Sequence, residues 1–190
     1  MNNRNLEDYE EKYNDKDHYD FEKFQIKFRR RNTLTLLNKN IHGSLLEIGC
    51  GMEPLFSYLD DYTSYTVVEP SDKFYNVAKE LAADDKRISL FHDYIENIIV
   101  DKKYDFIIVS NLLHEIENPA IVLDAIKKLC HTNSVVYINV PNAKSFHRLL
   151  ALEAGMISSI YNKSDNQIKF QQTHTYNITT LQSLVMSAGY

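Results

Sequence analysis

The feature that most constrains this chain is a pair of glycines, Gly49 and Gly51, that closes a short apolar run over residues 45–48. Pro54 follows, and proline favours the first turn of a helix. The pattern therefore predicts a strand, a tight turn and a helix. Because glycine has no Cβ and the first N–H groups of the helix point at the turn, a ligand can lie there against bare backbone.

A carboxylate follows at an informative distance. The next apolar run, residues 65–68, ends in Glu69 and Pro70, and Glu69 comes twenty residues after Gly49. In nucleotide-binding α/β folds this distance puts a carboxylate at the tip of the neighbouring strand, where it can accept both hydroxyls of a ribose. The two features together predict a nucleoside-like ligand at the carboxyl ends of two parallel strands.

The composition excludes several classes of protein. The chain has 190 residues, 44% hydrophobic and 25% charged, which suits one domain with a substantial core. Its formal net charge of -5 argues against non-specific binding to nucleic acid or anionic membrane. No run approaches the length of a membrane span, and the polar amino terminus is unlike a signal peptide. Cys50 and Cys130 form no disulfide framework or metal-ligand pattern, so we expect a cytoplasmic protein without a metal.

Five segments resemble, in order and spacing, the motifs of class I S-adenosylmethionine-dependent methyltransferases: LLEIGCGMEP, VVEPSDKF, LFHDYIEN, YDFIIVSNLLHEIENP and THTYNITTLQSLVMSAGY. The resemblance runs from about Ser44 to the last residue. It implies an α/β fold with a doubly wound parallel sheet, the Rossmann-like methyltransferase fold, and S-adenosylmethionine as cofactor with S-adenosylhomocysteine as product. The family normally adds two more strands after the last predicted helix. We expect both to be missing, either in a shortened chain or with the open edge covered by the amino-terminal segment or by a homodimer partner.

The chain divides into two predicted regions. Residues 1–40 form a helical lead-in or lid, with a helix from Phe21 to Leu37, and residues 41–190 form the cofactor-binding domain. Within the domain, residues 141–173 are an insertion that we expect to cap the substrate. Further predicted elements are a helix from Pro119 to about His131, a strand from Ser134 to Val140 and a last helix capped by Thr179. Four aromatics either form a lid over the site or cap the amino-terminal helix against the core, namely Tyr9, Tyr13, Tyr19 and Phe21.

The resemblance also assigns cofactor contacts. Asp93 and Tyr94 match the family positions that hold adenine, although Asp93 could instead only cap the turn that begins at Tyr94. Ser110 and Asn111 follow the fourth strand and match positions that line the methyl-transfer cleft. The remaining contacts are expected around the first two strands, at Glu47, Gly49, Cys50, Gly51, Glu69 and Pro70.

Arg30 has two possible roles. The run of residues 29–31 is most simply a solvated face of a helix. Arg30, however, shares a helical row with Ile26 and Leu34, and an inward arginine needs a partner, which the methionyl carboxylate of the cofactor could supply. Glu53 departs from the family pattern, because it brings negative charge toward that carboxylate unless it faces the ammonium group or solvent.

Methyl transfer from a sulfonium is an in-line displacement, so the protein mainly has to position the nucleophile and exclude water. A hydroxyl acceptor would gain from a base, and three histidines are candidates: His174, which we favour, His114 and His147. Each could equally be a structural histidine bonded to a backbone carbonyl. Glu115 is interpreted as a helix-leading acid and not as a catalyst.

We therefore predict an enzyme that transfers a methyl group from S-adenosylmethionine to an oxygen or nitrogen of a small polar acceptor. The segment VPNAKSFHRLL is loosely similar to bacterial enzymes acting on small molecules and surface-saccharide precursors, which makes a sugar precursor one candidate.

A non-catalytic binding protein is the first alternative. A nicotinamide-dependent oxidoreductase is the second, but its third glycine would fall at Pro54. A nucleic-acid methyltransferase lacks support, because no Asn/Asp-Pro-Pro-aromatic motif follows the fourth strand and the chain is acidic.

Overall fold

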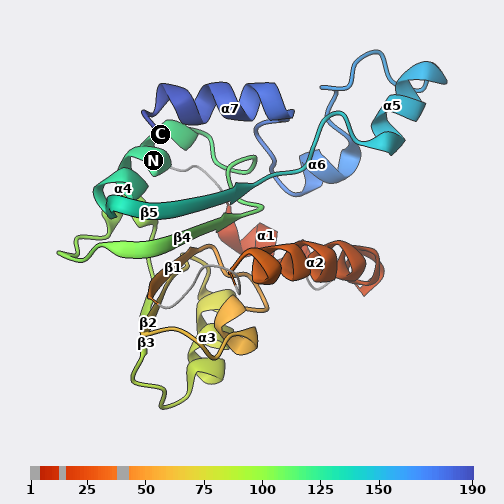
Figure 1. Ribbon diagram of the computed structural model, residues 1–190. Coiled ribbons are helices and arrows are strands. Elements are labelled where there is room, and N and C mark those ends of the chain that lie inside the picture. Colours follow the sequence, from red (N-terminus) through yellow and green to blue (C-terminus); the bar gives the residue numbers. More distant parts are fainter. Residues whose placement is uncertain (1–4, 13–15, 38–42) are drawn as a thin grey trace.

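The structure is a computed structural model that describes residues 5–12, 16–37 and 43–190 (Figure 1). Its centre is a five-stranded parallel sheet in the order β3-β2-β1-β4-β5. The strands are β1 (Ser44–Ile48), β2 (Ser64–Val68), β3 (Ile88–Phe91), β4 (Tyr104–Ser110) and β5 (Cys130–Asn139). The predicted doubly wound parallel sheet is confirmed. Its strand order reverses between β1 and β4, which is where ligands bind in open α/β sheets.

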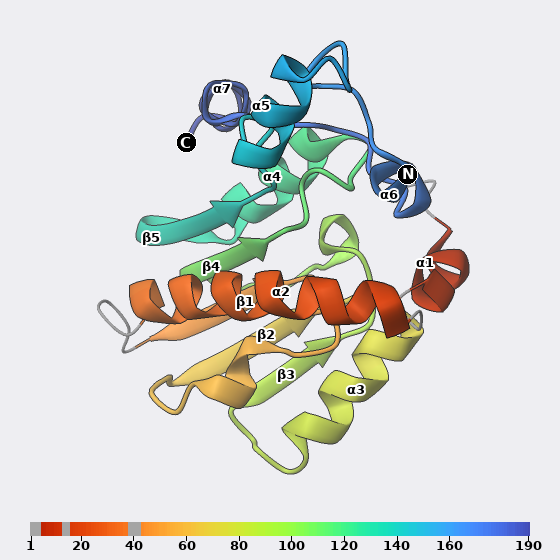
Figure 2. The same ribbon diagram turned by 90° about the vertical axis from the view of Figure 1, so that its right-hand side faces the viewer.

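Helices cover both faces of the sheet. α2 (Lys16–Leu37) and α3 (Asp72–Ala82) lie on one side, and α4 (Pro119–Lys128) and α7 (Ile178–Ser187) lie on the other (Figure 1). Three further helices, α1 (Leu6–Lys12), α5 (Phe146–Glu153) and α6 (Asp165–Lys169), lie toward the carboxyl ends of the strands (Figure 2). Two short 3₁₀ turns, Leu55–Tyr58 and Ile95–Asn97, follow β1 and β3.

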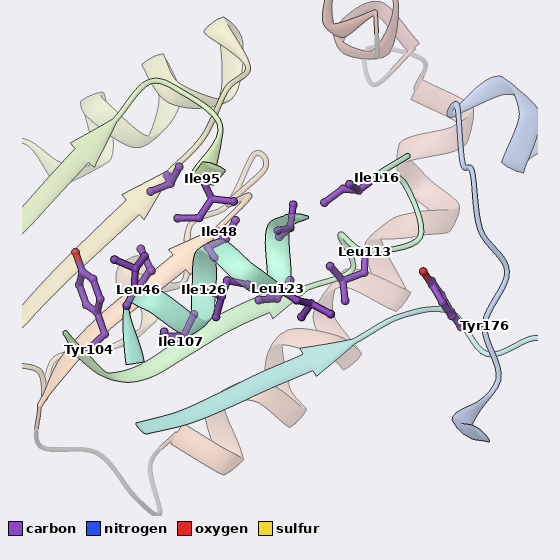
Figure 3. Close-up of a cluster of buried hydrophobic side chains, with 14 residues drawn as sticks. Leu46, Ile48, Ile95, Tyr104, Ile107, Leu113, Ile116, Leu123, Ile126 and Tyr176 are labelled. Carbon is purple, nitrogen blue, oxygen red and sulfur yellow. The ribbon is translucent and has the colours of Figure 1, made fainter. Parts of the chain in front are cut away.

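The core has two halves because successive strand residues point to opposite faces. Leu46 and Ile107 pack toward α4 and α7 (Figure 3), whereas Leu45 and Ile108 pack toward α2 and α3. All four are buried. A strand covered on both faces reads as a continuous apolar run, which explains why β1 and β4 could be recognised from the sequence.

Three predicted boundaries were wrong. α2 begins at Lys16 and not at Phe21, and α4 ends at Lys128 and not near His131. β5 then begins at Cys130, where a strand was expected only from Ser134. The reason is an irregularity in the pairing, since Cys130 pairs with Tyr104 and Val135 with Phe106. The extra residues between these pairs have no alternation that identifies them as strand.

The cap of the last helix was also wrong. Asn177, and not Thr179, precedes α7, and its Oδ1 accepts the Thr180 N–H at 2.9 Å. The Thr180 hydroxyl accepts the Asn177 N–H in return, also at 2.9 Å, which completes a capping box. Thr179 lies inside the helix and is exposed. Of the four aromatics considered for a lid, Tyr13 and the side chains of Tyr19 and Phe21 lie outside the described residues.

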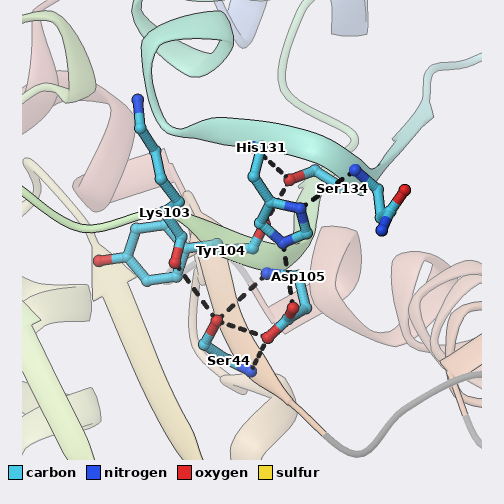
Figure 4. Close-up of polar contacts among 7 residues, drawn as sticks. Ser44, Lys103, Tyr104, Asp105, His131 and Ser134 are labelled. Carbon is cyan, nitrogen blue, oxygen red and sulfur yellow. Dashed lines mark hydrogen bonds and ion pairs between the residues drawn. The ribbon is translucent and has the colours of Figure 1, made fainter.

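A polar cluster ties the amino ends of three strands together (Figure 4). Asp105 on β4 accepts the Ser44 N–H at 2.6 Å and the Ser44 hydroxyl at 2.8 Å, and His131 Nε2 lies 3.0 Å from its second oxygen. The Ser44 N–H and hydroxyl hold the pKa of Asp105 below its usual range. A Cβ on Gly43 would lie 2.5 Å from the Asp105 carboxylate, so this position needs glycine. We call Ser44, Asp105 and His131 the rear cluster. It lies at the amino ends of the strands, whereas the glycine turn lies at their carboxyl ends.

Within the described part of the chain, no helix is both long enough and apolar enough to cross a membrane.

Candidate functional site

The turn after β1 has the backbone conformation that its glycines imply. Gly49 and Gly51 have φ values of 73° and 59°, in the left-handed region that residues with a Cβ rarely adopt. The Gly49 N–H continues the sheet ladder by donating to Val68 O at 2.9 Å. A Cβ on Gly51 would meet no atom within 4 Å. Gly51 is therefore required by its backbone conformation, and space is open beside it.

Glu69 closes this turn from the tip of β2. One oxygen of its buried carboxylate accepts the Cys50 N–H at 3.0 Å and the Gly51 N–H at 3.3 Å. The other oxygen accepts the Ser71 N–H at 3.0 Å, at the start of α3. Burial raises the pKa of Glu69 despite these bonds. The carboxylate thus fixes the shape of the turn as well as facing the space beside it.

That space is a cavity over the carboxyl ends of β1, β2 and β4, closed on other sides by α2 and α1. All eleven residues that the sequence assigned to the cofactor lie on its wall. They are Arg30, Glu47, Gly49, Cys50, Gly51, Glu69, Pro70, Asp93, Tyr94, Ser110 and Asn111. Their contacts with a ligand stay a prediction, but the fold brings them around one cavity from positions up to 81 residues apart in the chain, Arg30 to Asn111.

Glu47 has a further role beneath the cavity. Its carboxylate accepts the Tyr65 hydroxyl at 2.8 Å and the Leu55 N–H at 3.0 Å, so it joins β1 to β2 and to the 3₁₀ turn after the glycines. Burial raises the pKa of Glu47 to about 7, against the opposing effect of these two hydrogen bonds. The side chain is 4% exposed. Its charge therefore changes near neutral pH at the base of the site.

The residues after β3 and β4 are held by local bonds. Asp93 accepts the Tyr94 N–H at 2.7 Å and the Asn97 side-chain amide at 2.8 Å, so it caps the turn and also lines the cavity. Asn111 has a φ of 57°, and its N–H donates to the Asn139 side chain at 3.0 Å. Asn139 also donates to the Ser110 hydroxyl at 2.9 Å. β5 thus fixes the backbone at the end of β4.

Arg30 points inward, toward the cavity. It forms an ion pair with Glu53, and its guanidinium lies 4.1 Å from the centre of the Tyr58 ring. Its side chain is 12% exposed, so Arg30 is not part of a solvated face. The ion pair also shows where the unusual Glu53 directs its charge, which is toward Arg30 on the wall of the cavity.

The three candidate histidines do not line the cavity. His174 Nε2 lies 3.1 Å from Glu117 O, and His147 is exposed with Nε2 3.5 Å from the Ser145 hydroxyl. His114 is buried, and its Nε2 lies 3.7 Å from a Glu115 oxygen. Only His174 has the contact with a backbone carbonyl expected of a structural histidine, and the role of base stays an untested prediction for all three.

Sequence reasoning missed a pair of polar residues on the cavity wall. Glu115 is buried and accepts the Tyr9 hydroxyl, with oxygen distances of 3.2 and 3.4 Å. Both side chains line the cavity. Tyr9 was considered for a lid, but an isolated tyrosine before the first periodic helix gives no sign of its partner. Glu115 lies within the motif YDFIIVSNLLHEIENP, after the end of β4 at Ser110, and this position was the available signal.

α1 is held over the cavity from two sides. The Glu10 carboxylate accepts the Ser71 hydroxyl at 2.6 Å, at the start of α3. Gln171 exchanges two bonds with the Asn5 backbone, at 2.9 and 3.0 Å, and donates to Asp8 at 2.8 Å. Figure 2 shows α1 between α3 and α6. Between these contacts the Tyr9 ring packs edge-on against Phe74 and Phe170, with ring centres 6.2 and 6.1 Å apart.

Comparisons with known proteins agree with this architecture. The family model described as a methyltransferase domain matches residues 17–190. A comparison with curated proteins found no match.

Several solved structures share the fold. A possible histamine N-methyltransferase from Thermotoga maritima is 14% identical with a TM-score of 0.70, covering 97% of this chain and 80% of that one. The plantazolicin methyltransferase BpumL in complex with S-adenosylhomocysteine is 19% identical with a TM-score of 0.66, covering 97% and 74%. The N-methyltransferase NodS from Bradyrhizobium japonicum, also with S-adenosylhomocysteine, is 16% identical with a TM-score of 0.62, covering 85% and 73%. At these identities the likeness concerns the fold.

Proposed function

Because this chain belongs to the methyltransferase domain family, we propose that its cavity binds S-adenosylmethionine and that the enzyme methylates an oxygen or a nitrogen of a small polar acceptor. The observation that carries the proposal is the cavity itself. The positive-φ glycine turn, the buried Glu69 and the eleven assigned residues all meet there. The complexes of NodS and BpumL with S-adenosylhomocysteine support the choice of cofactor.

The residues present fit the parts of this cofactor. In this proposal Glu69, at the tip of β2, accepts the ribose hydroxyls, and Asp93 with Tyr94, after β3, holds adenine; all three residues line the cavity. The Arg30–Glu53 ion pair offers one charge of each sign, which suits the carboxylate and the ammonium of the methionyl end. The adjacent glycines leave room for that end to approach the backbone.

The bound cofactor supplies an activated methyl group on a sulfonium. The protein has to hold the acceptor in line with that methyl and keep water out. The roof over the cavity, formed by Leu6 and Tyr9 of α1, serves the second purpose. The carboxylates on the cavity wall, such as Glu69 and Asp93, favour the cationic sulfonium over a neutral ligand.

Calorimetric titration of the chain with S-adenosylmethionine, S-adenosylhomocysteine and NAD tests the proposal. We expect micromolar binding of the first two and none of NAD. Binding of NAD instead would favour the nicotinamide-dependent alternative. Binding of S-adenosylmethionine with no turnover on any acceptor class would favour a binding protein without catalysis.

A further inference from the structure

We propose that Tyr9 and Glu115 form the acceptor site and that the group they receive is an amine. This inference rests on the proposed function and narrows it to nitrogen methylation. It begins from the position of the two residues, which lie on the cavity wall but belong to no predicted cofactor contact. Glu115 follows the end of β4, and Tyr9 comes from the helix that roofs the cavity.

The geometry places a buried carboxylate where an acceptor would lie. Glu115 is 5% exposed, and its two oxygens lie 3.4 and 3.2 Å from the Tyr9 hydroxyl. His114 is a further neighbour, with Nε2 3.7 Å from a Glu115 oxygen. A carboxylate can accept several hydrogen bonds at once, so it can hold the N–H groups of an amine beside the tyrosine.

The charge of the wall favours the same class of acceptor. Among the described residues that line the cavity, two are basic, Arg29 and Arg30, and both come from α2. Arg30 is already paired with Glu53. Six of the described lining residues are acidic: Glu47, Glu53, Glu69, Asp93, Glu96 and Glu115. In a partly desolvated cavity this excess repels a phosphate or carboxylate near the acceptor position and attracts an amine. Phosphorylated sugar precursors are therefore disfavoured.

The chemistry gives Glu115 a role in the reaction. A protonated amine first loses one proton to water, and the nitrogen lone pair then attacks the methyl carbon. The C–N bond forms as the C–S bond breaks, and the electron pair of that bond stays on sulfur as a neutral thioether. Positive charge thus moves from sulfur to nitrogen. A carboxylate beside the nitrogen stabilises the charge where it develops, so its contribution is larger in the transition state than in the bound substrate.

Apolar side chains also line the cavity around this pair. Leu6 and Phe74 line the cavity on the α1 and α3 side, and Ile116 directly follows Glu115. Ile116 lies on the segment after β4, near Leu113 (Figure 3). These side chains suit an amine carried on an aryl or alkyl group, and they would leave the hydroxyls of a sugar without partners.

The test uses 2-phenylethylamine, tryptamine and a set of primary and secondary alkylamines, each matched with the alcohol and the phosphate monoester of the same carbon skeleton. Methylation is followed by the release of S-adenosylhomocysteine. The chain is compared with Glu115→Gln and with Glu117→Gln, a control two residues away whose side chain is exposed. Affinity for S-adenosylhomocysteine is measured for all three by calorimetry.

We expect turnover of amines alone. Glu115→Gln should lower kcat/KM for them by about 10- to 100-fold, with kcat falling, while it binds S-adenosylhomocysteine as the parent does. Glu117→Gln should match the parent. Equal or better turnover of the alcohols or phosphates, or no turnover of any amine by a chain that binds S-adenosylhomocysteine, would overturn the amine assignment. Failure of the parent chain to bind S-adenosylhomocysteine would instead overturn the proposed function.

Discussion

Glu47 and Glu69 are buried carboxylates on neighbouring strands, and each holds a different part of the cavity floor. Glu69 accepts the N–H groups of the glycine turn, whereas Glu47 accepts Tyr65 and the backbone of Leu55. Burial raises the pKa of both. We expect Glu69 to affect the affinity for the ligand and Glu47 to affect the pH dependence of stability, and the two effects can be measured separately.

Glu69→Gln should weaken the binding of S-adenosylhomocysteine by about 10- to 100-fold, because it removes hydrogen bonds between ribose hydroxyls and a charged group, worth roughly 1.5–3 kcal/mol. An amide oxygen can still accept the N–H groups of the turn, so the fold should persist, although the Ser71 N–H loses its acceptor and the free energy of unfolding should fall. Calorimetry measures the affinity. Glu80→Gln, an exposed position on α3, is the matched control and should bind as the parent does. Unchanged affinity in Glu69→Gln would show that the Glu69 carboxylate does not bind the ribose.

Glu47 should make stability depend on pH. Its pKa is raised from the ordinary 4.5 to about 7, so between these values the folded chain keeps a proton that the unfolded chain has lost. The stabilisation from this group is full below about pH 4.5 and is lost as the pH rises through about 7.

Replacing Glu47 by glutamine removes this titration. Relative to the parent, the free energy of unfolding of Glu47→Gln should rise by about 2–3 kcal/mol between pH 5 and pH 8. Urea unfolding of the two proteins at both pH values measures the difference. A difference that stays constant with pH would mean that Glu47 is ionised in the folded state throughout.

The role of a residue could be predicted from the sequence where its residue type, at that place in a motif, has few possible structural roles. The glycines at positive φ and the carboxylate after β2 are of that kind. Tyr9 and Glu115 are not, because their meaning comes from a contact between positions 106 residues apart. Histidine is ambiguous for the opposite reason. A ring such as that of His174 near a backbone carbonyl looks the same in sequence as one beside a substrate.

Among the elements, α1 depends most on side-chain contacts with the rest of the molecule. It has seven residues, too few for a stable isolated helix, so Glu10, Tyr9 and the contacts of Gln171 hold it in place. A helix held in this way can open without unfolding the sheet. The cavity would then exchange its ligands through movement of α1.

Gln171→Gly tests this arrangement. The substitution removes the bonds to Asn5 and Asp8, while glycine suits the φ of 53° at this position. Amide hydrogen exchange in residues 6–12 should become about tenfold faster, the effect of losing one or two net hydrogen bonds, with β1 and β4 unchanged. Exchange that rises equally in α1 and in the sheet would show that α1 does not open independently.

The cap of α7 provides a second test at this scale. Asn177→Ala removes the capping box and should lower the free energy of unfolding by about 1–2 kcal/mol. Thr179→Ala changes the residue that the sequence favoured as cap, and it should have almost no effect because Thr179 is exposed within the helix. Urea unfolding separates the two variants. Equal losses in both would contradict the cap seen in the structure.

Central strands such as β4 could be predicted because they are continuous apolar runs, and amphipathic helices such as α3 because their apolar residues recur at helical spacing. Element ends could not. The start of β5 depends on an irregular pairing with β4, and the cap of α7 depends on a choice between Asn177 and Thr179, which are both good cap residues. α1 has no clear period, so only its tertiary contacts identify it.

In the molecule as a whole, a cluster that contributes to stability and the cavity that binds the ligand lie at opposite ends of the strands. The rear cluster lies at the amino ends of β1, β4 and β5, and the cavity lies at the carboxyl ends. Changes at one edge should therefore leave the other edge intact, as distant sites in one domain usually behave additively.

Asp105→Ala should lower the free energy of unfolding by about 1–3 kcal/mol, because the Ser44 N–H and hydroxyl lose their acceptor. The affinity for S-adenosylhomocysteine should stay within about twofold of the parent, since additivity errors are roughly 0.3–0.5 kcal/mol. Asp101→Ala, an exposed position four residues earlier, is the control. A large loss of affinity in Asp105→Ala would show that the two edges are coupled.

The bonds between Asn5 and Gln171 span 166 positions of the chain. A ribosome therefore has to deliver nearly all of the described chain before α1 can form these bonds, although the five strands end at Asn139 and the contacts of α1 with Ser71 and Phe74 can form earlier. A growing chain can thus have the glycine turn and Glu69 assembled while the cavity still lacks its roof. S-adenosylmethionine, if present during synthesis, would meet an open site first and a covered site only when the carboxyl-terminal segment has folded.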